Sequence, residues 1–153
     1  MINSQTLEQV ICNAIEVHAL SAELYSALVK RTEDPRVRML LEDMTRHETR
    51  MTTVLRQFVG RVEPRILNTY LKHTLEKEPK AFIASLAPEG DNLSIADIGS
   101  LGQAIHQYLT DLFEHAHRGC AAGGSKELLA HLLQLELSER RTFARAVLST
   151  REL

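Results

Sequence analysis

The spacing of chain-breaking residues constrains this sequence more than any other feature. Its 153 residues contain four prolines and seven glycines, most of them in a few clusters between long stretches that have neither. Glycine and proline are the residues that most often interrupt regular structure, so the stretches between the clusters predict long helices. Their apolar residues recur with the 3.6-residue period of a helix. The predicted long helices cover about 4–31, 35–59, 94–118 and 125–150.

Local start signals support these boundaries. Asp34 followed by Pro35 is a typical N-cap with proline in the first helical position. Ser94 with Asp97 three residues later resembles a capping box. Ser125 stands at the start of the last helix and is expected to cap it.

The segment 61–93 predicts a long connection between the second and third long helices. It contains three of the four prolines and is expected to hold two short helices, at about 65–75 and 79–86. Short loops elsewhere make consecutive long helices antiparallel neighbours, whereas this segment must cross the bundle. We therefore predict an all-α fold, a single domain over 1–153 that forms an antiparallel four-helix bundle with a long helical crossover.

Composition limits the functional classes. The chain is long enough for a full hydrophobic core without disulfides, and two cysteines are too few for a disulfide framework. A net charge of −2 gives no global field that would attract nucleic acid or an anionic membrane. The sequence has no spanning apolar segment and no secretory signal pattern at its start. We expect a cytoplasmic protein with reduced thiols that binds neither nucleic acid nor membranes.

Each long helix places one ionisable residue on or beside its predicted inward face. In chain order these residues are His18, Glu48, His106 and Glu139. Glutamate is almost never fully buried unless it is paired, so their convergence predicts a polar cluster in the core. Two imidazoles and two carboxylates suit iron, manganese or zinc. An ordinary structural alternative stays open, in which buried histidine–glutamate ion pairs fill the same space.

The pattern also repeats between the two halves of the chain. An aromatic residue follows each histidine by seven positions: Tyr25 follows His18, and Phe113 follows His106. A glutamate follows the two histidines by thirty and thirty-three positions, so the halves resemble two versions of one helical hairpin.

Other polar residues near the predicted buried faces are not expected to be metal ligands. His47 and His131 flank their stripes as candidate donors to a metal ligand, and Glu136 is expected at the edge of the last helix, where it serves solubility. The face of that helix expected to be buried around Glu139 consists of Leu128, Leu132, Leu135, Thr142, Phe143 and Ala146.

Three segments carry a family resemblance. Residues 14–25 (AIEVHALSAELY) resemble the first-helix pattern of the ferritin-like superfamily, particularly rubrerythrin-type proteins, in which an inward ligand precedes a tyrosine by seven residues. Residues 41–51 (LEDMTRHETRM) resemble the second-helix motif, a leucine-rich run followed by Glu-x-x-His, and 132–142 resemble its repeat. The resemblance implies a ferritin-like bundle with an iron site in its core.

The chain departs from that motif in the same way in both halves. The family's di-iron site takes one carboxylate from each of helices one and three and Glu-x-x-His from each of helices two and four. Here His18 and His106 stand in place of the lone carboxylates, while Met51 and Thr142 stand in place of the motif histidines. With Glu48 and Glu139 as the matched glutamates, the four remaining ligands predict an altered or vestigial centre.

Three functions follow from these observations. The first is a metal-binding protein, with an oxidoreductase as the expected class if it is an enzyme, in which His18, Glu48, His106 and Glu139 hold iron, manganese or zinc; catalytic residues stay unassigned. The second is a metal-free interaction or regulatory module with histidine–glutamate pairs in a vestigial site. The third is a small-ligand binder with a dry cavity beside Met44, Met51 and Gly102.

Apolar residues outside the main stripes predict a homodimer. They lie on the first helix and on the last, where they form a candidate seam between two copies. This seam consists of Ile15, Ala22, Val29, Leu133, Ala144 and Leu148.

Overall fold

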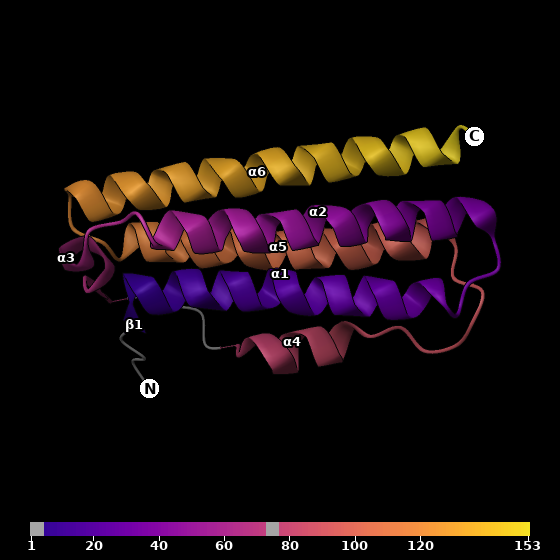
Figure 1. The fold of residues 1–153 in the computed structure, drawn as a ribbon, viewed down its shortest axis with the longest axis horizontal. Coiled ribbons are helices and arrows are strands. Elements are labelled where there is room, and N and C mark those ends of the chain that lie inside the picture. Colours follow the sequence, from indigo (N-terminus) through magenta and orange to yellow (C-terminus); the bar gives the residue numbers. More distant parts are fainter. Residues whose placement is uncertain (1–4, 73–76) are drawn as a thin grey trace.

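The computed structural model describes residues 5–72 and 77–153 and confirms the all-α prediction. Four long helices form an elongated bundle (Figure 1). These are α1 (Leu7–Val29), α2 (Pro35–Val59), α5 (Ile95–Arg118) and α6 (Gly124–Arg151). The second and third match their predicted bounds to within one residue, while α1 is shorter at both ends than the predicted 4–31.

The bundle consists of two antiparallel hairpins laid against each other. Helix α1 pairs with α2 and α5 pairs with α6, while α1 also packs on α5 and α2 on α6. Helices α1 and α6 therefore occupy opposite corners, and in Figure 1 they lie on either side of α2 and α5. Side chains that reach the centre from α1 can meet side chains from α6 across the diagonal.

The helix starts follow the sequence signals, with one exception. Thr6 forms a capping box with Gln9 at α1, and Asp34 caps α2 as predicted. Ser94 and Asp97 form the predicted box at α5, with both of its hydrogen bonds. The prediction that Ser125 caps α6 is wrong.

The N-cap of α6 is Gly123, which has no side chain to supply a cap. Its φ of 140° lies in a region that favours glycine. Ser125 lies inside the helix, and its hydroxyl hydrogen-bonds instead with the Thr69 hydroxyl of the crossover, at 2.7 Å.

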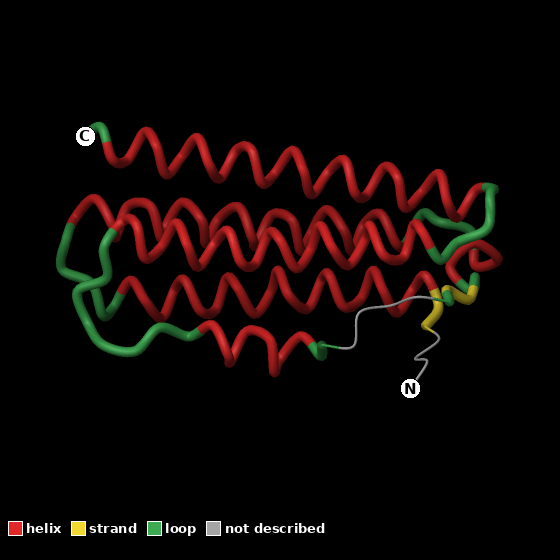
Figure 2. Tube along the Cα trace, turned by 180° about the vertical axis from the view of Figure 1, so that it is seen from behind, coloured by secondary structure: helices red, strands yellow, loops and turns green. Residues whose placement is uncertain are grey.

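The crossover is only partly helical. Helix α4 (Pro79–Leu86) has the predicted bounds and runs alongside α1 (Figure 2). The helix expected over 65–75 is wrong: α3 (Pro64–Leu67) is a single turn, and 73–75 lie outside the described residues. The chain then forms strand β2 (Tyr70–Leu71), which pairs antiparallel with β1 (Gln5–Thr6). These strand hydrogen bonds take the place of the helical ones expected over this segment.

The buried apolar residues of all four long helices form one continuous core. On α6 the buried face differs from the predicted one. Leu132 is buried as predicted, but Leu129, Glu136 and Val147 are buried where Leu128, Leu135 and Ala146 were expected. Each of these three follows an expected residue by one position, so the helix is turned relative to its predicted orientation. Within the described residues, no helix is both long and apolar enough to cross a membrane.

Candidate site in the bundle core

Four ionisable side chains lie within the core at mid-length of the bundle. His18 of α1 is 0% exposed, Glu48 of α2 is 4%, His106 of α5 is 4% and Glu136 of α6 is 1%. Each long helix therefore contributes one buried histidine or glutamate, as predicted. Three of the four are the predicted residues, and the fourth is Glu136 in place of Glu139.

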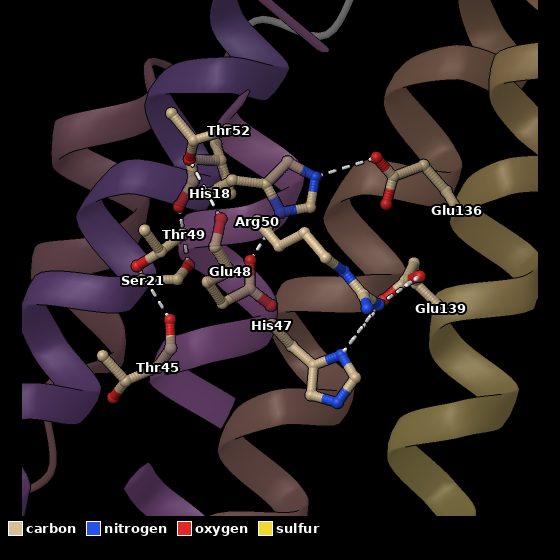
Figure 3. Close-up of polar contacts among 11 residues, drawn as sticks. His18, Ser21, Thr45, His47, Glu48, Thr49, Arg50, Thr52, Glu136 and Glu139 are labelled. Atoms are coloured by element: carbon tan, nitrogen blue, oxygen red, sulfur yellow. Dashed lines mark hydrogen bonds and ion pairs between the residues drawn. The ribbon is translucent and has the colours of Figure 1, made fainter. Parts of the chain in front are cut away.

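His18 bridges two carboxylates from different helices. Its Nδ1 lies 2.5 Å from Oε2 of Glu48, and its Nε2 lies 2.8 Å from Oε1 of Glu136 (Figure 3). The second contact crosses the bundle diagonal from α1 to α6. We call Glu48, His18 and Glu136 the core triad.

The geometry of the triad defines the protonation state of His18. A carboxylate oxygen accepts hydrogen bonds, so both ring nitrogens donate and the ring is an imidazolium. Burial alone would lower the pKa of His18, but the charges and hydrogen bonds of Glu136 and Glu48 outweigh it and raise the pKa from 6.5 to about 10. The ring therefore keeps both protons at neutral pH.

Nearby hydroxyl groups do not compete for the triad. Thr52 donates to the backbone carbonyl of Glu48, and Ser21 donates to that of Val17, one turn earlier in each helix. Thr110 donates in the same way to the carbonyl of His106. Because these buried hydroxyls are satisfied by their own helices, the carboxylates of the triad are left to His18.

Some buried polar atoms of the triad and its surroundings have no hydrogen-bond partner among the described residues. Oε2 of Glu136, within the triad, and the hydroxyl oxygen of Tyr25 are among them. Burial, followed by the negative charge of Glu48, raises the pKa of Tyr25 well above its usual value, so its hydroxyl stays protonated. The charge of Glu48 therefore acts on the hydroxyl of Tyr25, although no hydrogen bond joins the two side chains among the described residues.

His106 occupies the equivalent position in the second hairpin but has a different environment. No described residue hydrogen-bonds its Nδ1, and its ring packs against Phe143 of α6 with the centroids 5.2 Å apart. Burial lowers the pKa of His106, although the charges of Glu48 and Glu136 act in the opposite direction. His106 is therefore neutral where His18 is charged.

Glu139 lies outside the triad, at the edge of the bundle. Its side chain is 15% exposed, and its oxygens lie 3.8 Å from Nδ1 of His47 and 3.9 Å from a guanidinium nitrogen of Arg50. Figure 3 shows the two glutamates of α6 directed to different partners, Glu136 to His18 and Glu139 to Arg50 and His47. The expectation that Glu139 is central and Glu136 peripheral is the reverse of what the structure has.

A sequence signal for Glu136 existed. Glu48 follows His18 by thirty residues, and Glu136 follows His106 by the same thirty. Because the two hairpins are alike, equal spacing selects Glu136 as the partner of Glu48 in the repeat, whereas Glu139 breaks the symmetry by three residues.

A small cavity adjoins the triad on the side of His106. It measures about 20 Å³, and its lining includes Glu48, His106, Glu139 and His47. This volume holds about one water molecule. Three of the four predicted ligands therefore share one space, while both nitrogens of the fourth, His18, are hydrogen-bonded elsewhere. Across residues 5–72 and 77–153, no three His, Cys, Asp or Glu side chains are grouped so that they could hold a metal ion.

The dry cavity predicted beside Gly102 is filled by protein. A Cβ atom at Gly102 would lie 2.2 Å from the Phe143 ring, so that ring occupies the space left by the glycine. Met44 and Met51 are buried in the core, and Met44 also lines the small cavity beside His106.

Comparisons with known proteins bear on the fold. No protein-family model and no curated protein matches the chain. Among solved structures, the chain is similar to a crystal structure from Thermotoga maritima described as a putative ferritin-like diiron-carboxylate protein. The TM-score is 0.68 at 10% sequence identity, over 95% of this chain and 96% of that one. The bundle with its long crossover therefore has the ferritin-like fold, as the sequence resemblance predicted.

Proposed function

We propose that this chain is a metal-independent ferritin-like module, in which the imidazolium of His18 occupies the position of a metal centre and the bundle serves as an interaction or regulatory scaffold. One observation carries the proposal: both ring nitrogens of His18 are hydrogen-bonded to buried carboxylates. A protonated imidazole between two carboxylates supplies the positive charge that a cation supplies in a di-iron protein.

The donor set does not fit a di-iron centre of the kind named for the structural neighbour. Such centres use four glutamates and two histidines. The buried carboxylates here are Glu48 and Glu136, and both hold His18. Three residues after each of them, where the motif has histidine, stand Met51 and Glu139. A thioether is a soft ligand that suits neither iron(II) nor manganese(II) in an oxygen-rich site.

A specific observation favours a second candidate, the metal-binding protein predicted from the sequence. Glu48, His106 and Glu139 line one cavity, and Nδ1 of His106 has no partner among the described residues. The described residues are not grouped closely enough to hold an ion as they stand, so these three side chains would have to move together to hold a single iron, manganese or zinc ion, which would supply Lewis-acid or redox chemistry. His18, the fourth predicted ligand, would first have to release one of its carboxylates.

One experiment separates the two candidates. The untagged protein, purified without chelator and then loaded anaerobically with Fe(II), Mn(II) or Zn(II), is analysed for moles of metal per chain. In parallel, 15N NMR of the imidazole nitrogens reports the protonation of His18. The proposal expects sub-stoichiometric metal and an imidazolium spectrum for His18 that metal addition does not change. Stoichiometric metal that is lost in both His106→Leu and Glu48→Gln, but retained in the exposed control His131→Gln, would overturn it.

We also propose that the module is a homodimer, through the α1 part of the seam defined from the sequence, because α1 and α6 lie at opposite corners of the bundle and do not form one surface. On α1, Ile15, Ala22 and Val29 are only partly buried, which leaves apolar surface for a second copy. Light scattering of the purified chain tests this directly, because a mass near 17.2 kDa would contradict it.

A further inference from the structure

A groove separate from the core triad lies between the first turns of α5 and the last turns of α6. It has a volume of about 430 Å³ and lies at the end of the bundle near the C-terminus (Figure 1). This volume falls within the range typical of small-molecule sites. Its apolar wall consists of Ala96, Gly99, Phe143, Ala144, Val147 and Leu148.

The groove exposes apolar surface that the fold leaves uncovered. Leu148 is 58% exposed, one of the few large apolar side chains so exposed among the described residues. Gly99 contributes no side chain, so the groove reaches the backbone of α5 at that point. An apolar molecule lying here would cover Leu148 and rest on Val147, which is 8% exposed.

The charged residues of the groove are all of one sign. Arg140 and Arg151 line it, and no carboxylate does. Neither arginine forms a salt bridge with any residue that the structure describes. Eleven residues separate them, which corresponds to about 16 Å along a helix. The groove is therefore an apolar channel with a guanidinium group toward each end.

We propose that this groove binds an anionic amphiphile, a linear apolar chain with a terminal carboxylate. The carboxylate pairs with Arg140, which is half-buried beside Phe143, and the chain lies along Val147 and Leu148 toward Arg151. A guanidinium group can hold a carboxylate through two parallel hydrogen bonds, which favours this head over a cationic or uncharged one.

A second copy of the chain fits the groove less well. In a twofold contact the same surface faces itself, so the unpaired arginines of the two copies would be brought close together. An anionic amphiphile supplies both the missing negative charge and the missing apolar cover.

The structure also gives the site an internal reporter. Phe143 lines the groove and the small core cavity, and its ring contacts that of His106. An amphiphile seated against Phe143 therefore changes the environment of His106, which NMR detects without reliance on a functional assay.

The test uses the full chain and two probes with the same apolar chain, dodecanoate and dodecyltrimethylammonium, below the concentrations at which they form micelles. Calorimetry should show saturable one-to-one binding of dodecanoate, weaker by about tenfold or more in Arg140→Gln, since a charge-assisted hydrogen bond is lost. The matched control is Arg145→Gln, an exposed arginine of α6 outside the groove, which should bind as the wild type does. Ala144→Trp fills the groove from an exposed helical position and should abolish binding.

Several results would overturn the proposal. These are the absence of saturable dodecanoate binding, equal binding of the cationic probe, equal weakening in both arginine variants, or a His106 signal that dodecanoate leaves unchanged. A dimer that Ala144→Trp dissociates would assign the groove to a second copy and would also overturn it. Circular dichroism of each variant verifies that the helices are intact.

Discussion

The two hairpins place a buried histidine at equivalent positions, and the two histidines differ in their partners and in their charge. His18 donates to two carboxylates and is charged, whereas His106 packs on an aromatic ring and is neutral. The difference arises because Glu48 and Glu136 both hydrogen-bond with His18. The glutamate of the second hairpin therefore pairs with the histidine of the first. The two similar hairpins therefore have different cores. Because both carboxylates contact His18, a single imidazolium pairs with both of them.

The largest expected effect is on the free energy of unfolding, when the equivalent histidine of each hairpin is replaced by leucine. His18→Leu leaves two buried carboxylates facing each other without a cation, and we expect the free energy of unfolding to fall by about 3–5 kcal/mol. His106→Leu replaces a neutral ring by an apolar side chain and should cost less than about 1.5 kcal/mol. Urea denaturation followed by circular dichroism measures both.

A third variant keeps this comparison informative if His18→Leu does not fold. Replacing the whole triad by apolar residues, as His18→Leu, Glu48→Leu and Glu136→Leu together, removes the unpaired charges and should restore a folded bundle. Equal costs of the two single substitutions would show that the triad contributes no more than ordinary packing.

The next effect is the dependence of stability on pH. The folded pKa of His18, about 10, lies above the unfolded value of 6.5, so its contribution is complete below pH 6.5 and is lost as pH rises toward 10. The free energy of unfolding should fall by about 1.4 kcal/mol per pH unit between pH 7 and 9. His106 has the opposite effect on stability. Its pKa is lowered in the folded state, so its contribution to the free energy of unfolding is complete above pH 6.5 and is lost at more acidic pH.

Denaturation curves measured at several pH values test this slope. The exposed control His131→Gln should keep the wild-type slope, while the apolar triad variant should lose it. A stability that is flat from pH 7 to 9 in the wild type would contradict a charged His18.

Local signals predicted most of the fold because each acts within a few residues. Asp34 and Pro35 start α2, and Ser94 with Asp97 starts α5, through hydrogen bonds that the sequence itself specifies. The helix expected over 65–75 was wrong because Tyr70 and Leu71 pair with a strand more than sixty residues away. No local pattern encodes that partner.

The site was predicted less completely for the same reason. Periodicity correctly placed His18, Glu48 and His106 on inward faces, since these positions depend on their own helices. Helical periodicity alone does not choose between Glu136 and Glu139, because the choice depends on how α6 is turned against the other three helices; only the equal spacing of thirty residues in the two hairpins indicated Glu136. One turn of helix separates the two glutamates, and both lie near the same stripe.

A smaller effect compares these two glutamates. Glu136→Gln removes the charge that holds Nε2 of His18 in the core, and we expect a loss of about 1.5–3 kcal/mol. Glu139→Gln weakens only contacts of 3.8 and 3.9 Å at the bundle edge, and should change stability by less than about 0.5 kcal/mol. Thermal and urea denaturation of the pair measure the difference, and a larger loss for Glu139→Gln would indicate that it, and not Glu136, is the main partner in solution.

The smallest effect compares two glycines one turn apart on α5. A Cβ at Gly99 would lie 3.5 Å from Cγ1 of Val147, an ordinary contact, so Gly99→Ala should stabilise the chain by about 0.5–1 kcal/mol through the lower entropy of its unfolded state. A Cβ at Gly102 would lie 2.2 Å from the Phe143 ring, which must move away from His106, so Gly102→Ala should destabilise by about 1 kcal/mol. The opposite signs are the measurable outcome in urea denaturation. Phe143 covers Gly102 but not Gly99. If both substitutions stabilised the chain, the Phe143 ring would be free to move away from Gly102. The ring would then no longer separate the groove from the cavity beside His106.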